Sequence, residues 1–380
     1  MEYHRLGDYI REVNVRNRDL KVTNLLGVNL SKQFFPSIAN IIGMDLSKYK
    51  VIRKGQFGCK FMSVGRDGIL PISIMKEDEP AIISSAYYVF EVRDENVLLP
   101  DYLMMWLRRP EFDRQLAFYA GADVRGGVNY DDFCEMPIFI PSIARQREIV
   151  AEYEALSNRI RLNEQMIEKL EATAQALYRK LFVDGVDREH LPEGWRKGKL
   201  GDFGEVITGK TPSTFDEDNF GNYMPFVTIP DMHNGFFVIR TERMLSEKGV
   251  KSQANKTIPK NAISVSCIGT SGLVVITTQD CQTNQQINTI VLKNPDALFY
   301  LFMVCRDLEK IIAEYGIGGA VLNNLNKKDF ENLTAIVPSK DALKDSFYRL
   351  KPVFDRIYLC QQENLKLTEL QSLLLARMGK

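Results

Sequence analysis

The sequence predicts an α+β protein made of two similar mixed α/β domains, separated and joined by two long helices that form an antiparallel coiled coil with pseudo-twofold symmetry. Two observations lead to this prediction. The sequence repeats itself once, and each copy ends in a long stretch with apolar residues at heptad spacing. The predicted boundaries are 1–141 and 185–338 for the two domains, and 142–184 and 339–380 for the two helices.

The repeat is visible in short motifs that recur in order. Residues 129–133 (Asn-Tyr-Asp-Asp-Phe) return as 326–330 (Asn-Lys-Lys-Asp-Phe), and residues 140–142 (Ile-Pro-Ser) return as 337–339 (Val-Pro-Ser) at the same separation. This separation is far longer than the roughly 20–50 residues of a solenoid repeat. The chain is therefore two copies of one unit, each with a β-rich first part and a long helix at its end.

Each long helix is expected to begin after a Pro-Ser pair, where Ser142 and Ser339 are suitable N-caps. Apolar residues then recur in steps of four and three, which is typical of a coiled coil. The seam positions are Ile149, Leu156, Ile160, Ile167, Leu170 and Leu177 in the first helix, and Val353, Ile357, Leu367 and Leu374 in the second. We expect Asn163 and Asn364 to fix the register, and Pro352 to start or kink the second helix. Pairing of each helix with another subunit stays open as an alternative.

Composition limits the class of protein. The 380 residues include 49 Lys and Arg and 49 Asp and Glu, so the net charge is zero, whereas a DNA-binding protein that acts alone usually has a basic excess. This objection weakens if a partner protein shares the phosphate contacts. No apolar run approaches the roughly 20 residues that span a bilayer, and the N-terminus has no signal-peptide pattern, so we expect a cytoplasmic protein without membrane contact.

The cysteines and histidines do not indicate a metal site. None of the six cysteines lies in a Cys-x-x-Cys pair, and the chain has only three histidines. Closed zinc sites need four ligands at short paired spacings. We therefore expect no bound metal, and reduced cysteines that are mostly buried.

Residues 204–211 (Gly-Glu-Val-Ile-Thr-Gly-Lys-Thr) match the P-loop pattern for nucleotide binding. A true P-loop follows a buried strand and opens a helix, whereas polar residues precede this segment and Pro212 follows it. The chain also lacks an Asn-Pro-Pro-aromatic tetrapeptide, a glycine-rich loop for a methyl donor and a Gly-x-Ser-x-Gly nucleophile elbow. We therefore expect that this chain catalyses nothing itself.

Polar loops marked by glycines lie at matching places in the two copies, where residues 61–68 parallel 265–272 and residues 121–127 parallel 315–320. The segment 280–286 is rich in amide side chains, which can read base edges through paired hydrogen bonds. The candidate DNA-contacting residues are Ser63, Arg66, Arg125, Lys210, Ser271, Gln282, Asn284 and Gln285. For any single residue the simpler interpretation is a hairpin turn or a solvated amide.

The order of these motifs resembles that of the specificity subunits of type I restriction–modification enzymes over essentially the whole chain. The telling segments are residues 191–195 (Leu-Pro-Glu-Gly-Trp), 209–213 (Gly-Lys-Thr-Pro-Ser), 268–272 (Ile-Gly-Thr-Ser-Gly) and the Pro-Ser-Ile-x-x-Gln-x-Glu run at 141–148. In that family the segment 209–213 resembles the start of a target recognition domain, which argues against the P-loop. The first copy lacks the Pro-Glu-Gly-Trp lead-in and the Thr-Pro-Ser motif.

The resemblance implies that each recognition domain reads one half of a bipartite, asymmetric DNA target, and that the helix pair sets the unread gap between the halves. It also implies two methyltransferase subunits that dock on the helices and perform N6-adenine methylation. An ATP-driven translocase–nuclease (restriction) subunit is a further partner in complexes that also cleave DNA. This chain itself is then expected to hold no cofactor, because the partner subunits bind the methyl donor, Mg²⁺ and ATP.

Three alternatives stay open. The chain could serve a standalone methyltransferase without any nuclease. It could be a coiled-coil scaffold or a DNA mimic, although a mimic should be strongly acidic and this chain is neutral. It could also be a P-loop enzyme, in which case Lys210 would bind ATP.

Overall fold

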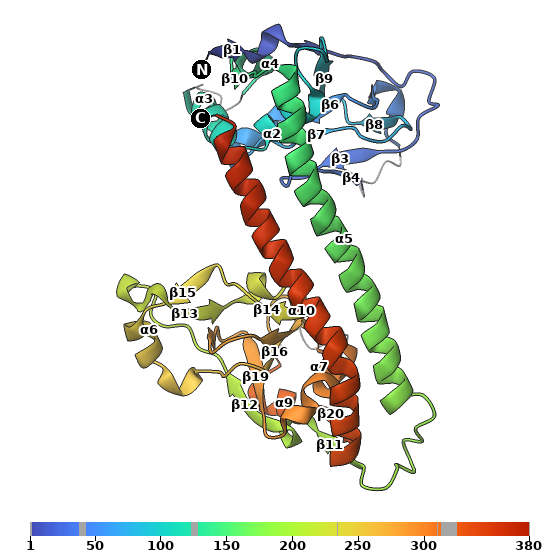
Figure 1. Cartoon of the computed structure of the whole chain (residues 1–380), viewed down its shortest axis with the longest axis vertical. Helices are drawn as coiled ribbons and strands as arrows, with labels where there is room; N and C mark the ends of the chain where they lie inside the picture. The colour runs from blue at the N-terminus through green and yellow to red at the C-terminus, as the bar shows by residue number, and fades with distance from the viewer. Residues whose placement is uncertain are drawn as a thin grey trace. The chain divides into compact units, whose positions relative to one another are not determined.

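A computed structural model (Figure 1) describes residues 2–37, 43–122, 128–233, 235–309, 311–312 and 325–379. It divides into two units. Unit 1 comprises two segments of the chain, Met1–Arg159 and Leu367–Lys380, and unit 2 comprises Ile160–Lys366. Each unit contains a mixed set of strands and short helices together with parts of the two long helices. The predicted α+β class with two similar units is confirmed.

Unit 1 is built on a four-stranded antiparallel sheet of order β2-β9-β6-β7. These strands are β2 (Ile10–Glu12), β9 (Tyr88–Val92), β6 (Phe57–Cys59) and β7 (Ile72–Ile74). Three strand pairs complete the β structure: β1 (Tyr3–Arg5) with β10 (Pro137–Phe139), β3 (Leu26–Val28) with β4 (Phe34–Pro36), and β5 (Lys50–Ile52) with β8 (Ala81–Ile83). The short helices are α1 (Val64–Asp67), α2 (Pro100–Leu107), α3 (Pro110–Ala122) and α4 (Tyr130–Cys134).

Unit 2 is built on a five-stranded sheet of order β12-β19-β16-β17-β14, beside which Figure 1 shows a second, smaller sheet. The five strands are β12 (Gly204–Thr208), β19 (Ile287–Leu292), β16 (Ile263–Ser266), β17 (Val274–Thr277) and β14 (Phe237–Val238). The smaller sheet contains β15 (Arg243–Leu245), β13 (Phe220–Val227) and β18 (Gln282–Thr283), and β11 (Arg196–Lys199) pairs with β20 (Thr334–Val337). The short helices are α6 (Glu247–Lys251), α7 (Leu298–Asp307) and α9 (Lys327–Glu331).

The two units repeat the same topology. The order β2-β9-β6-β7 in unit 1 corresponds to β12-β19-β16-β17 in unit 2, and the pair β1–β10 corresponds to β11–β20. The recurring Asn-x-x-Asp-Phe motif is a helix cap in both copies, because the Oδ1 atoms of Asn129 and Asn326 accept hydrogen bonds from the backbone N–H groups of Asp132 (2.9 Å) and Asp329 (3.0 Å). The sequence repeat therefore reflects a repeated structure.

The long helices are α5 (Ile143–Phe182) and α10 (Lys340–Arg377). In unit 2, Asn163 is buried in the seam, and its Nδ2 atom donates hydrogen bonds to Asn364 Oδ1 (2.8 Å) and Glu363 Oε2 (2.9 Å). In unit 1, Gln371 Nε2 donates to Ser157 Oγ at 2.7 Å. Residues later in α5 therefore meet residues earlier in α10, as the predicted antiparallel pairing requires. Pro352 lies inside α10, which begins earlier, at Lys340.

The seam residues contribute to the cores of the units as well as to the helix pair. In unit 2 the side chain of Ile357 is fully buried, and Ile167, Leu170, Leu177 and Val353 pack against the same core. In unit 1 the core contacts come from Ile149 and Leu374, while Leu156 and Leu367 are half-buried, as is Ile160 in unit 2. The last turn of α10 and the residues after it also complete unit 1. Leu375 and Met378 are buried there with Val150 of α5, and Tyr3 Oη donates to Gly379 O at 3.1 Å.

The cysteines are reduced, and five of them are buried while Cys134 is half-buried. Among the residues that the structure describes, no three His, Cys, Asp or Glu side chains are grouped so that they could hold a metal ion. None of the described helices is both long enough and apolar enough to cross a membrane.

The packing of Leu170 predicts a large cost for a charge at this position. We expect Leu170→Asp to lower the free energy of unfolding of unit 2 by about 3 kcal/mol, because it deletes an apolar contact and places a carboxylate against a core. Leu162→Asp is the matched control, since Leu162 lies on the same helix and is 49% exposed. Urea unfolding measures both variants, and equal midpoints would contradict the packing described here.

Candidate nucleic-acid interface

Three loops of unit 2 meet at one end of its large sheet. They are the segment that leaves β12 (209–211), the connection from β16 to β17 (267–273) and the connection from β18 to β19 (284–286). We call these residues the loop cluster. The strands β12, β19 and β16 are neighbours in the sheet, so the three loops emerge side by side. Four of the five candidates in unit 2 lie in this cluster: Lys210, Ser271, Asn284 and Gln285.

Backbone and side-chain hydrogen bonds hold two of these loops together. The backbone N–H of Lys210 donates to Thr283 O at 2.9 Å, and Thr211 Oγ1 donates to Gln285 Oε1 at 2.6 Å. Gly209 permits this approach, because a Cβ atom at this position would lie 2.2 Å from Asn284 O. The side chains of Lys210 and Gln285 remain exposed to solvent. The cluster therefore presents a cation and an amide from a fixed backbone.

The Asn284 side chain is half-buried and holds the turn in which it lies. Its Nδ2 atom donates to Gln286 Oε1 at 2.9 Å, and its Oδ1 atom accepts from the backbone N–H of Gln286 at 3.1 Å. This is a local side chain-to-backbone turn of the kind that asparagine favours. Asn284 thus shapes the loop that carries Gln285.

The loop 267–273 is shaped by Ser266 and two glycines. Ser266 Oγ donates to Thr270 O (2.7 Å) and accepts from the backbone N–H of Leu273 (2.9 Å). Gly269 and Gly272 have φ values of 78° and 96°, which a residue with a Cβ rarely adopts. Within the described structure, the Oγ atom of Ser271 is buried without a hydrogen-bond partner. A buried hydroxyl without a partner is costly, so Ser271 has an unused donor and acceptor at the cluster.

Gln282 is placed differently from its sequence neighbours. Its side chain is fully buried, where its Oε1 atom accepts from Gln253 Nε2 at 2.8 Å and its Nε2 atom donates to Thr257 Oγ1 at 3.1 Å. Gln253 Nε2 also donates to the carbonyl of Lys210 at 2.7 Å. The buried position argues against direct base contact by Gln282. Its amide instead binds Gln253, which in turn binds the backbone of Lys210 in the loop cluster.

In unit 1 the corresponding connection, from β6 to β7, contains Ser63 and Arg66. Ser63 is half-buried and precedes helix α1. The Arg66 side chain is 80% exposed and pairs with Asp67 through two hydrogen bonds of 2.8 Å, which raise the pKa of Arg66 and lower the pKa of Asp67. Although the Asp67 side chain is only 16% exposed, the guanidinium lies in solvent, which weakens the pair, so Arg66 can exchange its partner. The remaining candidate, Arg125, lies outside the described residues.

The P-loop match is not a P-loop in the structure. Residues 204–208 of the motif form strand β12, and the following residues run into the loop cluster instead of opening a helix. A thiol nucleophile is also disfavoured at this site, since burial raises the pKa of Cys267 to about 11 although a hydrogen bond from Asn288 opposes the shift. Cys267 therefore stays protonated at neutral pH.

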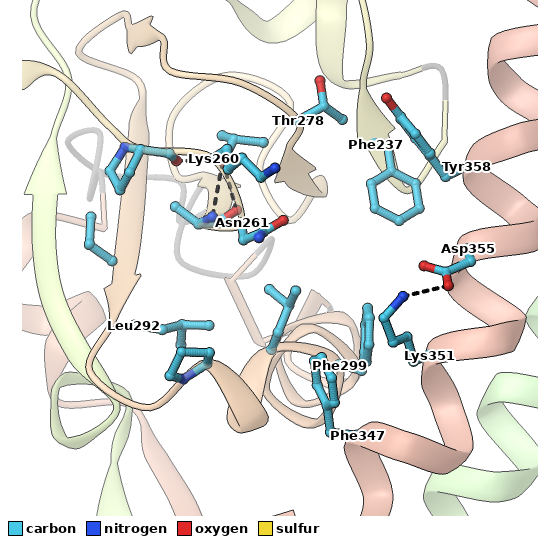
Figure 2. Close-up of a pocket in the computed structure, with 16 residues that line it drawn as sticks. Phe237, Lys260, Asn261, Thr278, Leu292, Phe299, Phe347, Lys351, Asp355 and Tyr358 are labelled. Atoms are coloured by element: carbon cyan, nitrogen blue, oxygen red, sulfur yellow. Dashed lines mark hydrogen bonds and ion pairs between the residues drawn. The ribbon is translucent and has the colours of Figure 1, made fainter. Parts of the chain in front are cut away.

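A cavity of about 430 Å³ lies elsewhere in unit 2, between the sheet, α7 and α10 (Figure 2). Figure 2 shows its aromatic side chains and the Lys351–Asp355 ion pair (2.6 Å) on its rim. Unit 1 has a cavity of about 320 Å³ at the equivalent place, with Glu154 and Asn158 where the repeat places Lys351 and Asp355. Because the charges differ, the two cavities do not offer one shared ligand site, and the loop cluster remains the better candidate.

Three residues that shape the site were missed by sequence reasoning. Thr211 orients Gln285, and Gln286 bonds with Asn284. Both lie in segments that the motif analysis had singled out, so their proximity to the candidates was the available signal. Gln253 gave no such signal, because it is 29 residues from Gln282 in the sequence.

The chain is similar to known specificity subunits of type I restriction enzymes. Residues 192–369 match the family model described as the type I restriction modification DNA specificity domain. The chain is 27% identical to the specificity subunit of the type I restriction enzyme HindI of Haemophilus influenzae, over 98% of this chain and 97% of the relative. It is 32% identical to the specificity subunit of the enzyme MjaIX of Methanocaldococcus jannaschii, over 33% of this chain and 29% of the relative.

Among solved structures, the chain is similar to the S subunit of a type I restriction–modification system from M. genitalium. The TM-score is 0.60 at 13% identity, and the match covers 99% of this chain and 95% of that one. At this identity the similarity shows a shared fold.

The buried amide of Gln282 predicts a structural role. We expect Gln282→Ala to lower the free energy of unfolding of unit 2 by about 2 kcal/mol, because Gln253 loses a buried hydrogen-bond partner. Gln285→Ala is the control, since its exposed side chain should leave stability within about 0.5 kcal/mol. Thermal unfolding followed by circular dichroism measures both, and a stable Gln282→Ala protein would return Gln282 to the surface candidates.

Proposed function

Because this chain belongs to the family of type I restriction–modification specificity subunits, we propose that each of its two units reads one half of a bipartite DNA target. The role of this family is recognition of a DNA sequence and not catalysis. The observation that carries the proposal is the duplicated sheet, whose equivalent loops carry different side chains in the two units. Two units that share a backbone fold but differ in their loop side chains are suited to two half-sites of different sequence.

Contacts to DNA in unit 2 are proposed to come from the loop cluster. The exposed ammonium group of Lys210 suits a phosphate, and the exposed amide of Gln285 suits an adenine edge, which an amide can contact by two hydrogen bonds. Ser271 has a buried hydroxyl without a partner at the same cluster and could complete its hydrogen bonding on DNA. Arg66 and Ser63 are the equivalent candidates in unit 1.

We further propose that two methyltransferase subunits dock on α5 and α10 and carry out N6-adenine methylation. In this scheme the partner subunits hold the methyl donor, Mg²⁺ and ATP, and the specificity subunit holds no cofactor. A restriction subunit adds ATP-dependent cleavage in complexes that contain one. The two long helices set the unread gap between the half-sites, because an α-helix has a fixed rise of about 1.5 Å per residue. The neutral charge of the chain fits a complex in which partners share the phosphate contacts.

The proposal predicts a new methylation pattern. Co-expression of this chain with its methyltransferase subunit should add N6-methyladenine at a split, asymmetric motif on both DNA strands, and methylation-sensitive sequencing of the host genome detects it. Expression of the methyltransferase alone is the control. A continuous motif would refute the two-reader scheme, and no new methylation by an assembled complex would refute the function.

A phosphate contact by Lys210 predicts a specific salt dependence. We expect Lys210→Ala to weaken binding to cognate and non-cognate DNA alike, and to reduce the slope of log K against log salt by about 1, because one fewer counterion is released. Lys293→Ala, at an exposed position after β19 and at the end of that strand away from the loop cluster, is the control and should keep the wild-type slope. Fluorescence anisotropy of the assembled complex at several salt concentrations gives both slopes. Equal slopes for the two variants would remove Lys210 from the interface.

A further inference from the structure

Two topologically equivalent loops follow the first strand of each large sheet. In unit 1 the loop 13–24 follows β2. It ends at Leu25, which forms a parallel bridge with Ile82 of β8, the strand that precedes β9. In unit 2 the loop 209–219 leaves β12 and leads into β13, which pairs in parallel with β18, the strand that precedes β19. We call these segments the tip loops. The tip loop of unit 2 begins in the loop cluster.

A buried asparagine anchors each tip loop. Asn17 is 1% exposed, and its Nδ2 atom donates to Val22 O at 2.8 Å. Asn219 is 5% exposed, and its Nδ2 atom donates to Ser213 O at 3.0 Å. A buried amide group without a hydrogen-bond partner costs free energy, so breaking either bond is unfavourable. These bonds therefore hold the two loops in defined conformations. Each loop is thus a firm support for the residue at its tip.

Both tips carry an apolar side chain in water. Phe215 is 100% exposed, and Leu20 is 55% exposed. Leu20 also has a φ of 54°, a left-handed conformation that is unfavourable for a residue with a Cβ. Neither side chain stabilises the fold by burial, and Leu20 costs backbone strain. Residues held in unfavourable backbone conformations are common at functional sites.

The charges beside the two tips differ. Leu20 lies between Asp19 and Lys21, which form an ion pair at 3.3 Å, and Arg18 beside them is exposed.

Three carboxylates follow Phe215. Lys248 Nζ lies 2.8 Å from Asp216 and 3.3 Å from Asp218, and Glu217 between them is exposed. A cation for a phosphate is offered in this loop by the exposed Lys210, near its start.

We propose that Phe215 and Leu20 are wedges that insert between stacked base pairs of duplex DNA, one in each half-site. Apolar side chains that partly unstack a base step are a known means of bending DNA onto a protein surface. The inference rests on the proposed DNA recognition and adds a deformation step to it, so specificity would include how easily each half-site unstacks. The two tips differ in size, because Phe215 offers a ring and Leu20 a branched aliphatic group.

The test uses the complex of this chain with its methyltransferase subunits, and duplexes of the mapped target with 2-aminopurine placed at successive steps. The wild-type complex should raise the fluorescence at one step in each half-site, in addition to the target adenine. Phe215→Ala should abolish the signal in one half-site and weaken binding about tenfold, while Phe215→Trp should retain both. Leu20→Asn should abolish the signal in the other half-site, because asparagine tolerates the same backbone conformation without an apolar tip.

Matched controls separate the wedge from general effects. Tyr223→Ala and Val97→Ala remove exposed apolar side chains (57% and 44%) outside the tip loops, and should keep both step signals. The signal at the target adenine should persist in all variants. Wild-type signals in Phe215→Ala and Leu20→Asn, or an equal loss in the controls, would overturn the wedge while the methylation motif still stands. Failure of the wild-type complex to methylate a split motif would instead refute the proposed function.

Discussion

The candidate interface depends on the pairing of one central strand with two neighbours. Strand β19 pairs with β12 on one side and with β16 on the other, and this pairing alone brings the three loops of the cluster together. Polar side chains fix the register across both pairs: Thr208 Oγ1 donates to Asn288 Oδ1 at 2.6 Å, and the Oγ atoms of Ser264 and Thr289 lie 2.8 Å apart in a buried position. A shift by one residue would turn every side chain to the opposite face and separate these pairs. The geometry of the site therefore depends on the register of β19 with β12 and β16.

Sequence reasoning predicted those features that local physics determines. The heptad spacing identified the two long helices, because this signal depends on residues close in the sequence. The Asn-x-x-Asp-Phe motifs were recognised only as a repeat, and the structure shows them to be helix caps. Burial of a single polar residue is different. Gln282 stands in an amide-rich run that looks exposed, yet it is buried because Gln253 and Thr257, far along the chain, supply its partners. Such pairings arise only when the chain has folded, and no periodicity reveals them.

The two units share their sheets but differ in their loops and cavities, as expected for a duplicated unit whose copies have diverged. The backbone hydrogen bonds that define the sheets are kept in both units, while the side chains on the loops and in the equivalent cavities differ in charge and size. A sheet tolerates this because its order depends on backbone pairing and on a conserved apolar face, and loop residues are free of both constraints. The tip loops show the same principle, since each retains a buried asparagine anchor but carries its own tip residue.

The two-segment composition of unit 1 has a consequence for synthesis on the ribosome. Leu375 and Met378 follow the whole of unit 2 in the chain, yet they belong to the core of the unit that is translated first. Until they emerge, the nascent unit 1 exposes the apolar surface that they will cover, and exposed surface of this kind favours association with chaperones or aggregation. Unit 1 can therefore complete its core only after unit 2 has been made, although its own first segment is finished much earlier. The last turn of α10 and the residues after it thus tie completion of the first core to synthesis of the second unit.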